Sequence, residues 1–182
     1  RSNNGNFELV SRDNASNGTF KFIGEAGSTE TTHLEISAAG NVAIGSGTAS
    51  EKLHLMADGS VGTRIERASN DGNSGVLDFY KTRGTLASKA VVGTADTVGA
   101  LRAFGYDGSN YIQGGEIAFK TNGTPGTNDM PTQFVVSTTA DGAASPTVRM
   151  SIDSAGVVSI PGTLSVTSGT TIGSLDIGHG AG

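Results

Sequence analysis

Apolar and polar residues alternate along most of this chain in short runs, and glycine-containing turns separate the runs. Alternate residues of a strand point to the same side, so each run predicts a short β-strand with one apolar face. Helices are not expected, because the longest stretch without glycine, residues 127–141, contains Pro131. The pattern therefore predicts an all-β protein of short meanders and hairpins.

The same pattern of strands occurs twice, which indicates an internal duplication. Residues 34–44 align without gaps on residues 150–160, and each copy has a four-residue turn that ends in Gly40 or Gly156. The glycine supplies the positive φ that so short a turn needs. The strands upstream also correspond, and the matched pairs are Phe7-x-Leu9 with Ile117-x-Phe119 and Phe20-x-Phe22 with Phe134-x-Val136.

The two copies predict a division of the chain into four parts. Residues 1–50 form a β-meander/hairpin module, and residues 117–162 form its second copy. Residues 51–116 form a central β module with exposed loops, and residues 163–182 form a shaft segment rich in Gly, Ser and Thr. The strands expected in the central module are 53–55, 63–67, 76–80, 90–92, 101–104 and 111–112.

The composition predicts a thin core for a single chain. Hydrophobic residues make up 35% of the sequence and aromatic residues only 5%. There is no cysteine, so stability has to come from packing and association. Identical chains wrapped around an axis would cover the apolar faces, and small side chains would let three backbones approach closely.

The charge and hydropathy exclude two classes of partner. The net charge is −5, and three associated chains would carry three times that charge, which argues against nucleic-acid binding. No apolar run approaches the roughly 18 residues that a membrane span needs, so no membrane insertion is expected. The sequence begins at Arg1 without a methionine, and a piece of a longer protein is expected.

Two stretches resemble phrases of phage tail-fibre and tailspike proteins. Residues 40–55, G-N-V-A-I-G-S-G-T-A-S-E-K-L-H-L, resemble the family's GNVGIGT-SP-KLHV phrase. Residues 150–156, M-S-I-D-S-A-G, resemble the start of its MRIDSSGNVGIGT phrase. Residues 175–182 are similar to segments before the distal repeats and the C-terminal intramolecular chaperone of some fibres. The sequence departs from the family at Ser46 and at residues 161–164.

The resemblance implies a parallel homotrimer at the end of a virion. The expected fold is an elongated homotrimeric fibre of short β-meander/hairpin modules joined by Gly/Ser/Thr-rich shaft segments. Its expected role is a structural segment of an extracellular tail fibre that mediates host attachment. The expected partners are its own copies, other tail proteins and a host surface glycan or protein receptor. The alternatives are a tailspike with polysaccharide depolymerase activity and a bacterial extracellular trimeric fibre adhesin.

Catalytic chemistry is not expected in this chain, and no cofactor or metal is predicted. The nucleophile-elbow pattern G-x-S-x-G is absent, and no two histidines have metal-ligand spacing. On a threefold axis one histidine per chain would form a ring of three, which makes His54 and His179 weak ion-binding candidates. The carboxylates available for glycoside cleavage, which are more easily interpreted as turn acids or solvated residues, are Asp71, Asp78, Asp96, Asp107, Glu116 and Asp129.

A glycan site is predicted in the loop that contains Tyr106, Asp107, Asn110 and Tyr111. Two tyrosines offer flat apolar faces, and the Asp and Asn beside them offer the hydrogen-bonding groups that sugars need. The alternative interpretation is that the two tyrosines clamp a hairpin.

Overall fold

The computed structural model describes residues 2–3, 6–7, 18–26, 28–45 and 47–165 of the chain. All regular structure in these residues is β-strand, which confirms the all-β prediction. None of these residues belongs to a helix that is long and apolar enough to cross a membrane. The chain divides into two compact units, Arg1–Val76 and Leu77–Gly182, which are described separately below.

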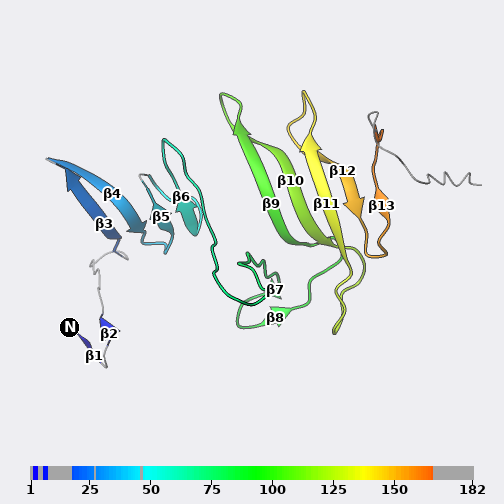
Figure 1. Cartoon of the computed structure of the whole chain (residues 1–182), viewed down its shortest axis with the longest axis horizontal. Coiled ribbons are helices and arrows are strands. Elements are labelled where there is room, and N and C mark those ends of the chain that lie inside the picture. The colour runs from blue at the N-terminus through cyan, green and yellow to red at the C-terminus, as the bar shows by residue number, and fades with distance from the viewer. Residues whose placement is uncertain (1, 4–5, 8–17, 27, 46, 166–182) are drawn as a thin grey trace, which may run out of the picture. The chain divides into compact units, whose positions relative to one another are not determined.

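Figure 1 shows the strands, which lie in four sheets. The strands of the first unit are β1 (Ser2–Asn3), β2 (Asn6–Phe7), β3 (Phe20–Ala26), β4 (Thr29–Ile36), β5 (Val42–Ile44) and β6 (Leu53–Leu55). The strands of the second unit are β7 (Arg83–Gly84), β8 (Lys89–Ala90), β9 (Thr97–Tyr106), β10 (Tyr111–Thr121), β11 (Thr132–Thr139), β12 (Pro146–Ile152) and β13 (Val158–Ser159).

The first unit is built on a four-stranded sheet in the order β3-β4-β5-β6. Its cross-strand register places apolar residues in two rows on one face. The rows are Phe20, Ile36, Val42 and Leu53, and Phe22, Leu34, Ile44 and Leu55. The row between them, on the opposite face, consists of Lys21, Glu35, Ala43 and His54. The period of two has therefore given this sheet one apolar and one polar face.

Strands β5 and β6 pair in parallel, an arrangement that the sequence pattern did not predict. The Val42 N–H donates to Lys52 O and the Met56 N–H donates to Ile44 O, both at 2.9 Å. The connecting segment begins at Gly45, whose φ is +103°, in a region that L side chains rarely adopt. A glycine thus allows the chain to leave β5 and return beside it.

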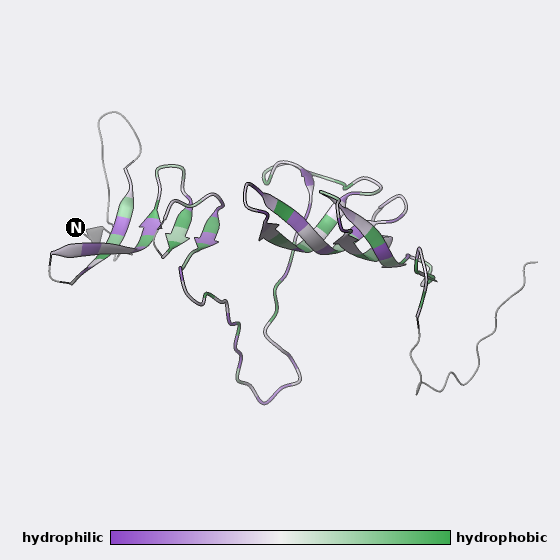
Figure 2. Ribbon diagram, turned by 90° about the horizontal axis from the view of Figure 1, so that it is seen from above, coloured by the Kyte–Doolittle hydropathy of each residue, from purple (hydrophilic) through white to green (hydrophobic). Residues whose placement is uncertain are grey.

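The second unit is built on an antiparallel sheet in the order β13-β12-β11-β10-β9. Its register also places apolar residues in two rows on one face. Figure 2 shows apolar and polar residues alternating along its strands. The rows are Leu101, Ile117, Val136 and Met150, and Phe119, Phe134, Ile152 and Val158. Phe79 lies against Gly99, the residue opposite Phe119, where a Cβ would come within 2.8 Å of the Phe79 Cβ.

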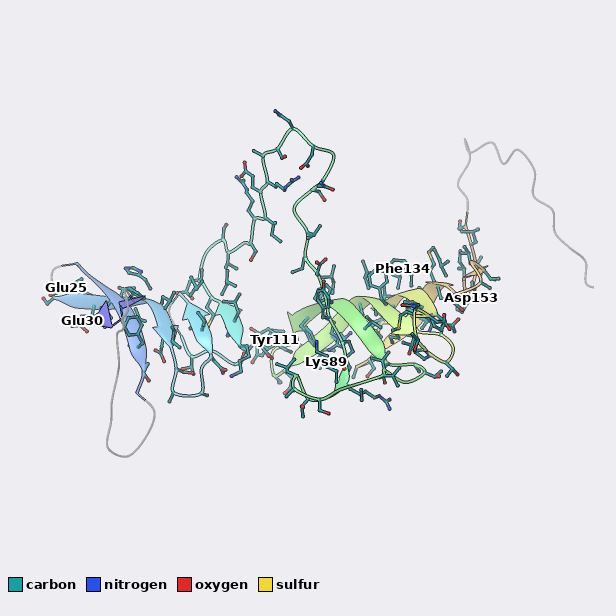
Figure 3. All side chains as sticks on the ribbon, turned by 90° about the horizontal axis from the view of Figure 1, so that it is seen from below. Glu25, Glu30, Lys89, Tyr111, Phe134 and Asp153 are labelled. Atoms are coloured by element: carbon teal, nitrogen blue, oxygen red, sulfur yellow. The ribbon has the colours of Figure 1, made fainter. Side chains whose placement is uncertain are left out.

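The segment that carries β7 and β8 covers the other face of this sheet. Figure 3 shows Lys89 of β8 on the side of the sheet away from Phe134. Arg83 fastens the segment by a bidentate contact with Asp96, in which Nε and Nη2 each lie 2.8 Å from a carboxylate oxygen. The Thr121 N–H donates to Asp96 O, and the Thr121 side chain is almost fully buried. The Thr121 hydroxyl donates to Gly93 O at 2.5 Å. The ion pair thus holds Arg83 to Asp96, and Thr121 attaches residues 93–96 to β10.

This ion pair predicts a weaker second unit in acid. The contact from Arg83, followed by the Gly93 N–H, lowers the pKa of Asp96 from 3.8 to about 2. Because the folded-state pKa lies below the unfolded one, the stabilisation is complete above pH ~4 and is lost as the pH falls through the folded value. We expect Asp96→Asn to flatten the pH dependence of unfolding in this range.

The measurement is urea denaturation between pH 5 and pH 2, followed by tyrosine fluorescence. All three tyrosines, Tyr80, Tyr106 and Tyr111, belong to the second unit, so the signal reports that unit alone. Asp141→Asn, at an exposed carboxylate in the β11–β12 loop, is the matched control. Equal pH slopes for the wild type and for Asp96→Asn would contradict the prediction.

The two segments that were aligned by sequence have matching backbone geometry. Phe20 and Phe22 pair with Ile36 and Leu34, as Phe134 and Val136 pair with Ile152 and Met150. A register shift follows each upstream pair, after Phe22 and after Val136. Both turns close with similar hydrogen bonds and end in a glycine of positive φ, +74° at Gly40 and +83° at Gly156.

Two strands predicted for the central module do not form, and two other predictions are left untested. No strand forms at 63–67 or 76–80, because residues 57–81 pair with no strand among the residues that the structure describes. The four-part division stays a prediction, and β10 extends across its boundary between residues 116 and 117. Leu9 and most of the shaft segment, residues 166–182, lie outside the described residues.

Candidate functional site

The predicted glycan residues meet at the tip of the β9–β10 hairpin. Tyr106 and Tyr111 are direct cross-strand partners, with ring centroids 5.4 Å apart and an angle of 56° between the ring planes. Both remain open to solvent, with exposed fractions of 62% and 74%. The hairpin therefore presents an aromatic pair at its end, and the pair also clamps the two strands.

The turn between the tyrosines uses the Asp107 carboxylate as a structural group. The Ser109 and Asn110 N–H groups donate to Asp107 Oδ1 at 2.8 and 2.7 Å, and the Asp107 N–H donates to Asn110 O at 3.0 Å. The contact with the Asn110 N–H, then that with the Ser109 N–H, lowers the pKa of Asp107. One carboxylate oxygen thus holds the turn. Glycan binding at this tip stays a prediction.

The two histidine candidates for an axial ion ring stay predictions as well. His54 is half-buried in the polar row of the first sheet, and its Nδ1 lies 3.4 Å from both the N and the Oγ of Ser50. His179 lies outside the described residues. Within the part of the chain that the structure describes, no group of three or more His, Cys, Asp or Glu side chains is arranged to hold a metal.

Several carboxylates considered for glycoside cleavage form ion pairs. Asp71 lies 2.6 Å from Arg67, and this contact holds the pKa of Asp71 well below its usual range. Burial alone would raise the pKa of Glu116, but Arg102 at 2.9 Å and Lys120 at 3.5 Å lower it. A general acid needs a raised pKa. These groups are therefore suited to holding loops and strands, and the expectation of no enzymatic activity stays a prediction.

The apolar faces of both sheets are open to solvent in the single chain. Only four hydrophobic residues among those described are buried: Ala43, Val92, Ala118 and Val135. Eight members of the apolar rows are exposed by 40% or more: Phe22, Ile36, Ile44, Leu53, Leu101, Ile117, Phe119 and Val158. A hollow of about 230 Å³ on the second face is lined by Leu77, Phe79, Ala100, Leu101, Ile117 and Phe119. Contiguous exposed apolar surface of this extent is typical of interaction sites in proteins.

Sequence reasoning missed one further hollow, beside β7 and β8. It measures about 330 Å³ and is lined by Tyr80, Lys81, Thr82, Leu86 and Lys89. The charge pattern could have pointed to this region, because residues 79–95 contain three basic residues and no acidic residue in an otherwise acidic protein.

Comparison with solved structures identifies the architecture. The carboxy-terminal domain of the bacteriophage T5 L-shaped tail fibre superimposes with a TM-score of 0.65, over 95% of this chain and 90% of that one. The described chain has the fold of a phage tail-fibre domain. The expected resemblance to phage tail fibres is confirmed at this level, with a sequence identity of 15%.

The same T5 domain with its intramolecular chaperone domain is also similar, with a TM-score of 0.57 and 15% identity. This chain is covered to 87% and spans 57% of that longer chain. Neither a protein-family model nor a curated protein sequence matches the chain. The likeness is thus one of fold, carried by the pattern of strands and turns and not by sequence identity.

Proposed function

We propose that this chain is a structural segment of a phage tail fibre and assembles as a parallel homotrimer on the virion. The observation that carries the proposal is the pair of open apolar faces on a tail-fibre fold. Burying a half-exposed aliphatic or aromatic side chain contributes about 1 kcal/mol, and each chain has eight such side chains in its apolar rows. The sum is comparable to the cost of association, estimated at roughly 4–15 kcal/mol.

Identical chains are the partners that suit these faces best. The apolar rows contain no charged residue, so like faces do not repel each other. The charged side chains near the rows lie on the opposite faces, as Lys21 and Glu35 do in the first unit and Arg102 and Glu116 do in the second. Three sheets that turn their apolar faces toward a common axis would enclose one core and leave the charges outside.

A solution mass tests the assembly directly. Light scattering on this chain is expected to give three times the mass of one chain. The longer natural product should be measured alongside, because a fibre that needs a chaperone segment for assembly would otherwise give a misleading result. A stable, monodisperse monomer from both proteins would refute the proposal.

Attachment to the host surface is the second part of the proposal, with a glycan or protein receptor as the partner and other tail proteins at the remaining contacts. The aromatic pair at the β9–β10 tip supports it, because the two rings contact each other and are both exposed. We expect Tyr106→Ala/Tyr111→Ala to lower adsorption of the assembled fibre to host cells several-fold. Undiminished adsorption, with the sheet intact by circular dichroism, would exclude the tip as the contact site.

The proposal assigns no catalytic step to this chain. Purified host polysaccharide is therefore expected to keep its chain length after incubation with the protein. Progressive shortening would favour the tailspike alternative.

A further inference from the structure

The hollow beside the β7–β8 hairpin combines an aromatic ring, an aliphatic side chain and two ammonium groups. Its volume of about 330 Å³ lies within the range of small-molecule sites, roughly 300–1,000 Å³. Tyr80 and Leu86 in its lining are exposed by 93% and 88%. Both therefore expose most of their apolar surface to water. Such a surface is suited to a ligand with an apolar side.

The local charge selects for an anion. The charge of Arg83 is balanced by its ion pair with Asp96. Neither Lys81 nor Lys89 forms an ion pair with any residue in the described part of the chain. The Lys81 ammonium donates to the carbonyl oxygen of its neighbour Thr82 at 2.8 Å. No carboxylate lines the hollow. Asp96 attracts Lys81 as well as Arg83, so one carboxylate is shared by two of the three cations of this segment. The excess of positive charge gives the hollow a positive potential in a protein whose net charge is −5.

The backbone of the segment that carries the lining is held by hydrogen bonds within the segment. β7 and β8 pair through Arg83 with Ala90 and Gly84 with Lys89. The turn between them is closed by the Thr85 N–H, which donates to Ser88 O at 2.9 Å. The Thr82 hydroxyl, which also lines the hollow, lies 2.8 Å from both Arg83 O and Ala90 O and can donate to either. A backbone that is already ordered loses little conformational entropy when the site binds a ligand.

We propose that this hollow binds an anionic sugar unit, a saccharide that carries a carboxylate or a phosphate. The apolar C–H face of a pyranose ring packs on the Tyr80 ring with Leu86 beside it, and the anionic group lies between Lys81 and Lys89. The inference rests on the proposed attachment role and gives it a contact separate from the β9–β10 tip. That tip offers Asp107 in place of a cation, so it suits a neutral sugar better.

Saturation-transfer NMR on the full chain tests the inference with defined probes. Methyl glucuronide and glucose 6-phosphate represent the two anionic sources, and glucose is the neutral counterpart. We expect saturable binding of at least one anionic sugar, with glucose at least tenfold weaker. Lys81→Gln/Lys89→Gln should weaken binding tenfold or more, and Tyr80→Ala several-fold. Arg64→Gln removes an exposed cation from the other unit and should leave binding unchanged.

The possible outcomes test separately the anionic group, the sugar ring, the site itself and the attachment role. Preference for the glucuronide would support uronic-acid units as the source, and preference for the phosphate would support phosphorylated units. Equal binding of glucose would overturn the anionic assignment. Inorganic phosphate that binds as well as glucose 6-phosphate, with no effect of Tyr80→Ala, would overturn the sugar assignment. Absence of all binding would refute the site even if the fibre adsorbs to cells, whereas binding without adsorption would contradict the attachment role alone.

Discussion

Leu101→Asp is expected to abolish assembly while leaving the sheet of the second unit folded. Leu101 lies in an apolar row beside Ile117, and it is 56% exposed in the single chain. In the isolated chain water solvates a carboxylate at this position. In a closed trimer the carboxylate would be buried away from water, with no cation to pair with it. An unpaired buried charge costs several kcal/mol, so the association constant should fall by at least about 100-fold.

Light scattering over a dilution series, with circular dichroism in parallel, measures this effect. Met130→Asp is the matched control, because Met130 is similarly exposed, at 53%, but lies in the β10–β11 connection and not in the apolar rows. The control should retain the trimer mass. An unchanged mass for Leu101→Asp at low protein concentration would show that this face is not the interface.

The local strand pattern could be predicted from the sequence because it depends on neighbouring residues. In β3–β4–β5 and in β11–β12–β13 the alternation is regular, and Gly40 and Gly156 indicate the turns. The long β9–β10 hairpin was expected only as the separate fragments 101–104, 111–112 and 117–119, the last of them in another module. Its alternation is hidden where small residues replace large ones, at Gly99, Ala100 and the pair Gly114–Gly115.

Features that depend on distant residues could not be predicted. The parallel pairing of β5 with β6 joins segments across an irregular connection, and nothing in the residues themselves distinguishes it from an antiparallel hairpin. Residues 63–67 and 76–80 alternate as strands do, but no strand edge in the described part of the chain completes their hydrogen bonds. The alternation of apolar and polar residues shows which side of a segment is apolar. Whether the segment forms a strand depends on a neighbouring strand that accepts and donates its backbone hydrogen bonds.

The candidate sites show the same limit. Tyr106 and Tyr111 could be paired from sequence because five positions separate them across a turn with Asp107 and Gly108. The hollow beside β7 and β8 could not be predicted in this way. Its lining lies in residues 80–89, and their arrangement depends on the contact between Arg83 and Asp96, which are thirteen positions apart. A charge count identified the cationic stretch, but only the fold placed Lys81 and Lys89 around one space.

Gly45→Ala is expected to lower the free energy of unfolding of the first unit by more than about 3 kcal/mol. The residue has a φ of +103°, and a Cβ there would overlap the backbone carbonyl oxygen of Met56. A positive φ alone costs an alanine roughly 1–2 kcal/mol. The overlap adds to this, because backbone cannot rotate away as a side chain can. Relief requires β6 to separate from β5, which breaks the hydrogen bond from the Met56 N–H to Ile44 O.

Gly40→Ala separates the two contributions within the same unit. Gly40 also has a positive φ, +74°, but a Cβ there would meet only the Lys52 ammonium at 4.0 Å. We expect it to cost about 1–2 kcal/mol, the conformational term alone. Amide hydrogen exchange of β4 and β5 reports the first unit, while tyrosine fluorescence, confined to the second unit, should be unchanged in both variants. Similar exchange rates in the two variants would mean that the contact between Gly45 and Met56 does not hold β6 beside β5.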